Sequence, residues 1–201
     1  MYRSANYPTD PEAAEAFVAG QRHGQLIATP PGGFPCVSIL PFVKHGDQIE
    51  LHIVQEDPTF EAVLANARVT FFISDFLAFS PHHWVNAEDA GRGTLHFQAV
   101  QYACQATTST DPDDVAAALR GVMARYEPGA TFRPLQNDAF YGARLSRLAV
   151  VRLRVVGMQA KFKVGPASAA EVKRNVVARL RVRNEPGDAR AADVIARTVV
   201  D

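Results

Sequence analysis

The segment that most constrains the fold is residues 68–75, a short run of β-branched and aromatic side chains (Arg-Val-Thr-Phe-Phe-Ile-Ser-Asp). Such a run favours a strand, and it is much shorter than the roughly 20 apolar residues that a membrane-spanning helix needs. It lies in the middle of residues 51–101, where aromatic, histidine and amide side chains gather. We therefore expect a β-rich core around this segment, with any functional site close to it.

Other strand-like segments recur along the chain, mostly separated by turn residues such as the Pro-Pro-Gly-Gly of residues 30–33. In residues 94–101 the side chains alternate, so that Leu95 and Phe97 share one face of a strand and His96 and Gln98 the other. Short strands followed by C-terminal helices favour a mainly β (α+β) architecture, an antiparallel barrel or sandwich with appended helices. The predicted strands cover residues 25–29, 34–43, 48–54, 69–74, 94–107, 148–156 and 159–164, and the last two are expected to pair with each other.

Helices are predicted where a capping residue precedes apolar residues at helical spacing. Thr9 begins the first helix, Asp57 with Pro58 the second, and Ser168 opens a capping box before a helix that packs through Val172, Val176 and Leu180. Residues 130–147 fit no regular pattern. The predicted helices cover residues 9–21, 57–65, 111–126, 168–183 and 188–197.

Composition excludes several classes of protein. At 201 residues and 47% hydrophobic, the chain suits one packed domain, or one domain with a helical appendage. It has neither a membrane-length apolar run nor an apolar signal core, so a cytoplasmic protein without a membrane partner is expected. Cys36 and Cys104 stand far apart and outside any metal or redox spacing, which predicts buried thiols in a reducing compartment. The absence of a glycine-rich phosphate loop and of a nucleophile elbow argues against a Rossmann enzyme and an α/β-hydrolase.

The net charge of zero conceals a basic segment. Residues 144–183 carry 11 Lys and Arg against a single acid, Glu171. Such a segment is either a solvated face, a face that docks on acidic surface of the same or a twin chain, or a site for phosphate or nucleic acid. The basic residues of 168–183 lie on several helix faces and form no helix-turn-helix pattern, so the sequence alone does not indicate DNA binding.

A succession of motifs resembles the PaiB family, whose members are described as FMN-binding negative transcriptional regulators built on the FMN-binding split barrel. The similarity runs through Met1-Tyr2 and Pro8, Leu40-Pro41-Phe42, residues 52–58 (His-Ile-Val-Gln-Glu-Asp-Pro), residues 80–84 (Ser-Pro-His-His-Trp), residues 94–101 (Thr-Leu-His-Phe-Gln-Ala-Val-Gln) and Lys161-Phe162-Lys163. The chain departs from the family at polar positions: Gln55 replaces an Arg, His82-His83-Trp84 replaces Ser-Trp-Tyr, Gln101 replaces a His, and residues 164–167 (Val-Gly-Pro-Ala) replace Leu-Ser-Gln-Asn.

The resemblance implies a split barrel over residues 1–164 with a helical extension over 165–201, and FMN as the cofactor. An FMN pocket needs cations for the phosphate, amides or hydroxyls for the polar edge of the ring, and apolar surface for its face. Lys161 and Lys163 share one strand face and suit one anion, although edge-strand lysines are also ordinary. The predicted cofactor-binding residues are His52, Gln55, Ser80, His82, His83, Trp84, His96, Gln98, Gln101, Lys161 and Lys163.

Several of these residues have other interpretations. Three histidines, at positions 82, 83 and 96, could bind a metal or haem, but no Cys or carboxylate stands at ligand spacing, so hydrogen-bonded histidines are favoured and no metal site is predicted. Trp84 could stack on a flat ring or lie in a dimer interface.

Three functions remain open from the sequence. The first is a homodimeric FMN-binding protein with a regulatory or redox role, its flat phosphorylated ligand at the dimer interface. The second is a barrel that has lost flavin and binds another small ligand. The third is a flavin-dependent oxidoreductase, in which the cofactor rather than the protein carries the chemistry. DNA is a partner by the resemblance alone, and no catalytic residue is identified.

Overall fold

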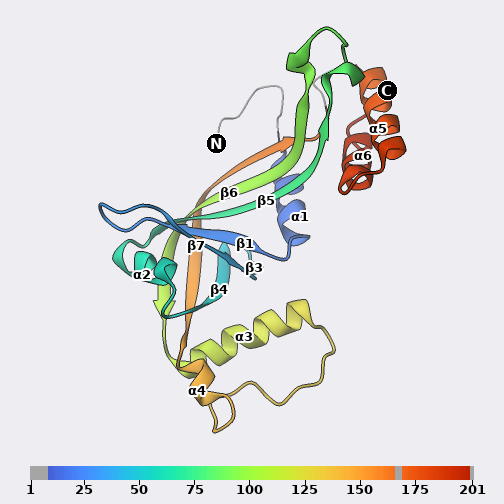
Figure 1. Cartoon of the computed structure of the whole chain (residues 1–201). Coiled ribbons are helices and arrows are strands. Elements are labelled where there is room, and N and C mark those ends of the chain that lie inside the picture. Colours follow the sequence, from blue (N-terminus) through green and yellow to red (C-terminus); the bar gives the residue numbers. More distant parts are fainter. Residues whose placement is uncertain (1–8, 166–168, 200–201) are drawn as a thin grey trace. The chain divides into compact units, whose positions relative to one another are not determined.

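The computed structural model describes residues 9–165 and 169–199 of the chain, so the family-like residues Met1, Tyr2 and Pro8 and the predicted helix cap Ser168 lie outside the described residues. The elements in order are α1 (Pro11–Ala19), β1 (Gly24–Ala28), β2 (Cys36–Leu40), β3 (Val43–His45), β4 (Gln48–Val54), α2 (Pro58–Ala65), β5 (Arg68–Ser80), the 3-10 helices η1 (His82–Trp84) and η2 (Ala90–Arg92), β6 (Thr94–Ser109), α3 (Pro112–Tyr126), α4 (Gly142–Leu145), β7 (Leu148–Lys163), α5 (Ala170–Arg183) and α6 (Asp188–Ala196) (Figure 1).

Within these residues the strands form one seven-stranded antiparallel sheet in the order β2-β1-β5-β6-β7-β4-β3. The chain divides into two compact units, and the long strands β5, β6 and β7 contribute residues to both. Unit 1 comprises residues 1–17, 74–100 and 160–201, and unit 2 comprises residues 18–73 and 101–159.

Unit 2 contains the four short strands β1 to β4, in which β1 pairs with β2 and β3 with β4. In β4 the alternation is clear: Ile49, Leu51 and Ile53 are buried and pair with β7 in register, with Leu51 opposite Val151. Helix α3 packs against β3 and β4, and its end is fixed because the Tyr126 hydroxyl donates to the carbonyl oxygens of Arg22 and Phe42 at 2.6 and 3.0 Å. These bonds connect helix and sheet across a long stretch of sequence.

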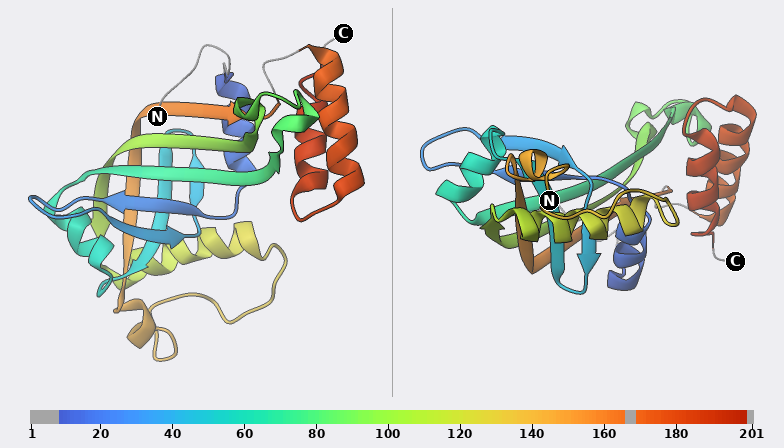
Figure 2. Two further views of the ribbon diagram at one scale, coloured as in Figure 1. Left: turned by 45° about the horizontal axis from the view of Figure 1, so that its top comes forward. Right: turned by 90° about the horizontal axis from the view of Figure 1, so that it is seen from below.

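Unit 1 is organised around α5 and α6, which lie side by side (Figure 2). Their facing sides bury Val176, Leu180 and Ile195 in one cluster with Leu77 and Trp84. The predicted packing residue Val172 is only half-buried, whereas Val177 is buried instead. Because α5 and α6 share this core with β5 residues, they belong to unit 1; the predicted domain boundary after residue 164 stays a prediction.

Three predicted strand boundaries are wrong. The predicted strand 34–43 is two strands, β2 and β3, separated at Pro41, which has no N–H to donate to a ladder. The predicted strand 69–74 continues to Ser80 in β5. The predicted pair of strands after residue 148 is one strand, β7, because Gly157 keeps a negative φ and continues the extended backbone instead of turning it.

Smaller corrections concern caps and cysteines. The Asp10 carboxylate, rather than Thr9, caps α1 by accepting from the Ala13 N–H at 3.1 Å, and the Thr9 hydroxyl accepts from the Phe162 N–H. Cys104 is buried, and burial raises the pKa of its thiol to about 11, whereas Cys36 is only half-buried. In the part of the chain described, no helix has the length and apolar character needed to cross a membrane.

Candidate functional site

Eight of the predicted site residues belong to unit 1 and three to unit 2. The eight come from the end of β5, from η1, from the start of β6 and from the end of β7. They are Ser80, His82, His83, Trp84, His96, Gln98, Lys161 and Lys163, whereas His52, Gln55 and Gln101 lie in unit 2.

The structure brings Ser80 and His96 into direct contact. The Ser80 hydroxyl oxygen and His96 Nε2 are 2.7 Å apart, and the two residues are only 2% and 0% exposed. Burial, followed by the positive charges of Lys163 and Arg183, lowers the pKa of His96 to about 4. The imidazole is therefore neutral near pH 7, and its buried Nδ1 has no hydrogen-bond partner among the described residues.

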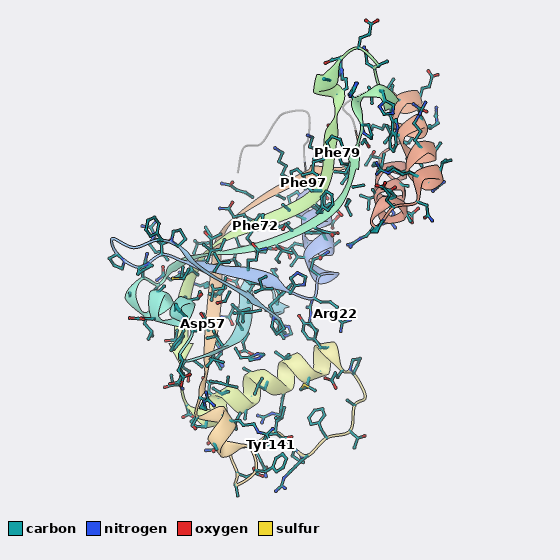
Figure 3. The ribbon with its side chains drawn as sticks, in the orientation of Figure 1. Arg22, Asp57, Phe72, Phe79, Phe97 and Tyr141 are labelled. Carbon is teal, nitrogen blue, oxygen red and sulfur yellow. The ribbon has the colours of Figure 1, made fainter. Side chains whose placement is uncertain are left out.

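The opposite face of β6 is more open. Phe97 is half-buried there, and the Lys161 ammonium nitrogen lies 5.9 Å from the centroid of its ring. On the neighbouring strand β5, Phe79 is 49% exposed; Figure 3 labels both phenylalanines. Lys163 shares the face of Lys161 by its two-residue spacing and is half-buried. We call Phe79, Phe97, Lys161 and Lys163 the aromatic–lysine surface.

Sequence reasoning did not select Phe79 and Phe97 as site residues. The alternation in residues 94–101 already places Phe97 opposite His96, so a signal for Phe97 was present in the sequence. Phe79 had no comparable signal, because β5 was predicted to end at Ser74.

The three predicted site residues of η1 differ in their exposure to solvent. His83 is exposed and His82 half-buried, with their rings edge to face at 5.6 Å between centroids. Trp84 is 8% exposed, and the Arg183 guanidinium lies over its ring at 4.9 Å from the centroid. The indole is thus part of the unit 1 core, with Arg183 on one face. Gln98 is half-buried on β6.

The three predicted site residues of unit 2 lie within or beside strands of the sheet. The Gln55 amide nitrogen donates to the carbonyl oxygens of Ser146 and Leu148 at 3.0 and 2.8 Å, so the residue that replaces the family's Arg fixes the chain entering β7. His52 is half-buried on β4; its Nδ1 has no hydrogen-bond partner in the described chain, and burial lowers the pKa of its ring. Gln101 is half-buried on β6.

The residues of unit 1 can therefore offer a flat ligand an aromatic surface and two lysines on one strand face. Among residues 9–165 and 169–199, no group of three or more His, Cys, Asp or Glu side chains is arranged to hold a metal ion. The described arrangement suits a phosphorylated aromatic ligand better than a metal ion.

Solved structures share this fold at low sequence identity. A flavocytochrome, Anf3 from Azotobacter vinelandii, superposes with a TM-score of 0.64 and 21% identity over 79% of this chain and 70% of its own. A FAD and heme binding protein from Mycobacterium smegmatis gives 0.58 and 15% over 83% and 78%. A conserved hypothetical protein from Mycobacterium tuberculosis gives 0.58 and 15% over 81% and 90%. No curated protein matches in sequence.

The sheet and these likenesses define the fold class: the protein has the antiparallel fold of the FMN-binding split barrels, with appended helices, as predicted. A profile of the family described as "Putative FMN-binding domain" matches residues 1–161. The chain belongs to this PaiB-like family, which confirms the family resemblance drawn from the motifs.

Proposed function

We propose that the protein binds FMN as a homodimer and uses the flavin in a regulatory or redox role. The observation that carries this proposal is the pairing of Lys161 with Phe97, a cation beside a flat ring on the open face of β6, in a chain of this family. Lys163 adds a second positive charge two residues further along β7. A phosphate favours such paired cations, and a flavin ring favours an aromatic surface.

Each group has a definite part in this proposal. Lys161 and Lys163 bind the phosphate, while Phe79 and Phe97 cover the ring and exclude water from it. His96, held by Ser80, is neutral and adds no charge of its own beside the two lysines. When bound, FMN supplies one- or two-electron redox chemistry, and the protein supplies binding and orientation.

An exposed apolar surface of unit 2 supports the proposal of a dimer. Strand β2 lies at one edge of the sheet, and three apolar side chains on or beside it face solvent: Phe34, Val37 and Ile39, which are 91%, 54% and 67% exposed. An exposed apolar edge strand invites pairing with another chain, so a twin copy is a natural partner.

The test is the visible absorption spectrum of purified protein, before and after incubation with FMN and gel filtration. Retained flavin bands are expected. The double variant K161Q/K163Q is expected to weaken FMN binding by about tenfold or more, since two charge-assisted contacts to phosphate are lost. The matched control is K44Q, because Lys44 also lies over an aromatic ring, Tyr102 at 5.7 Å, but belongs to unit 2.

A colourless protein that releases added FMN would contradict the proposal and favour a barrel that binds another ligand. If flavin is retained, titration with NAD(P)H separates the two roles. Bleaching of the flavin supports a redox role, whereas a bound flavin that is inert to reductants supports a regulatory one.

A further inference from the structure

Helices α5 and α6, here called the C-terminal hairpin, lie beyond the residues 1–161 that match the family. They are nevertheless built into the same unit as most of the predicted site residues. The hairpin shares one hydrophobic cluster with Leu77 and Ala78 of β5 and with Trp84 of η1. A segment outside the family domain therefore contacts the His82–Trp84 part of the candidate site directly.

Trp84 is held by the hairpin through both its backbone and its ring. The Asn175 side-chain amide of α5 donates to the Trp84 carbonyl oxygen at 2.7 Å. The Arg183 guanidinium, at the end of the same helix, lies 4.9 Å from the centroid of the Trp84 ring. A three-residue 3-10 helix such as η1 has little stability of its own, so these outside contacts determine where it lies.

Arg183 is itself fixed in place. Its guanidinium donates to both carboxylate oxygens of Asp188, at 2.8 and 2.5 Å, and Asp188 is only 1% exposed. The Asp188 carboxylate also accepts from the Glu185 N–H at 2.9 Å. Hydrogen bonding to Arg183 lowers the pKa of Asp188, and that to Asp188 raises the pKa of Arg183, so both remain charged near neutral pH. A bidentate pair of this kind restricts the guanidinium to one orientation beside the indole.

The hairpin is also attached to β5 itself. Arg190 of α6 pairs with Asp75 at 2.5 Å, and Gly187 brings its backbone so close to the Leu77 carbonyl that a Cβ would collide with that oxygen. The hairpin therefore holds β5 and η1 at the same time, at the two sides of Ser80.

We propose that the C-terminal hairpin is part of the ligand site, and that Arg183 is a positioning residue which acts through Trp84 to hold His82 and His83 at the site. This inference rests on the proposed function, with FMN as the ligand. It also assigns Trp84 a supporting role: Arg183 covers one face of the indole, so flavin stacks on the aromatic–lysine surface rather than on that face.

Trp84 is the only tryptophan in the chain, so its fluorescence reports its contacts with Arg183 and Asn175 independently of FMN. The variants are R183Q, which removes the charge over the indole, and N175A, which removes the bond to the Trp84 carbonyl. R183K is the partial variant, since lysine keeps the charge but cannot make the bidentate pair with Asp188. The matched control is R181Q, because Arg181 lies on the same helix and pairs with Asp193 at 3.4 Å.

We expect R183Q to increase acrylamide quenching of Trp84 about twofold and to weaken FMN binding by about tenfold, because His82 and His83 lose the support of Trp84. N175A is expected to act in the same direction, R183K to restore only part of the binding, and R181Q to change neither readout. Far-UV circular dichroism identifies folded variants, and N175A keeps the test decisive if R183Q does not fold.

The proposal is overturned if R183Q and N175A free Trp84 while FMN affinity stays at the wild-type value, or if R181Q weakens binding as much as R183Q. If the wild type binds no FMN, the function proposed above fails. In that case the fluorescence of Trp84 alone tests whether Arg183 and Asn175 hold this residue in place.

Discussion

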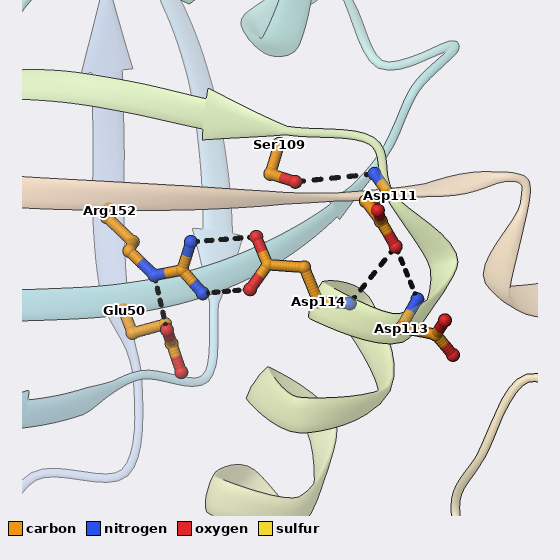
Figure 4. Close-up of polar contacts among 6 residues, drawn as sticks. All are labelled: Glu50, Ser109, Asp111, Asp113, Asp114 and Arg152. Atoms are coloured by element: carbon orange, nitrogen blue, oxygen red, sulfur yellow. Dashed lines mark hydrogen bonds and ion pairs between the residues drawn. The ribbon is translucent and has the colours of Figure 1, made fainter.

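At the scale of single residues, Arg152 on β7 joins two carboxylates in unit 2. Its guanidinium donates to the Asp114 carboxylate at 2.9 and 2.5 Å and to Glu50 at 2.8 Å (Figure 4). Hydrogen bonds from Arg152 lower the pKa of Asp114 to about 2. Because the folded-state pKa is depressed, the stabilisation is complete above the ordinary pKa of about 3.8 and is lost as pH falls towards 2.

We therefore predict that D114N lowers the free energy of unfolding by about 1 kcal/mol at pH 7, a value discounted for partial solvent exposure. The difference from wild type should shrink as pH falls from 4 to 2. Urea denaturation at both ends of this range measures it. D89N is the control, since the Arg92–Asp89 pair is 55% and 50% exposed and should contribute almost nothing. An undiminished difference at pH 2 would rule out the electrostatic explanation.

His96 gives a second prediction at this scale. Burial lowers the pKa of this imidazole from 6.5 to about 4, so the folded state binds fewer protons than the unfolded chain between these values. Stability should therefore be full above pH 6.5 and should fall as pH decreases towards 4. H96Q should remove this part of the pH dependence. Titration of the His96 ring protons by NMR tests it directly, and a midpoint near 6.5 would contradict the buried, neutral state.

At the scale of elements, the position of the C-terminal hairpin depends on Gly187. Its φ of 93° lies in the left-handed region, and a Cβ would collide with the Leu77 carbonyl oxygen. We predict that G187A costs about 2 kcal/mol or more and makes Trp84 more accessible to quencher. G129A is the matched control: Gly129 has a φ of 82° but no neighbour within 4 Å, so only the backbone strain remains. Equal effects of the two variants in thermal unfolding would show that the close approach to β5 is unimportant.

How well the elements could be predicted depended on whether their signals were local. Strand β4 was predicted with its bounds, because apolar residues alternate and turn residues flank it, and Asp57 with Pro58 marked the start of α2. The continuity of β7 through Gly157 was not predicted. A glycine indicates a possible turn, but pairing with the neighbouring strands determines whether the backbone turns or stays extended there. The surroundings of Trp84 were not predictable for the same reason: Arg183 follows it by almost a hundred residues, and contacts at that separation leave no periodic signal.

At the scale of the whole molecule, the proposed homodimer makes a prediction about β2. Ile39 is 67% exposed on this edge strand, and a lysine there would place a charge in any apolar contact between two copies. We expect wild-type protein to have the mass of a dimer and I39K that of a monomer at the same micromolar concentration. Light scattering coupled to gel filtration measures both.

The control for this prediction is V182K, because Val182 is also an exposed apolar residue, 86% accessible, but lies on α5. It should leave the mass unchanged. If the ligand lies where two chains meet, I39K should also release FMN, since each half-site would lack its partner. A dimeric I39K would exclude the β2 edge as the interface. A monomeric I39K that still retains flavin would instead confine FMN to one chain, and the aromatic–lysine surface would then have to hold it alone.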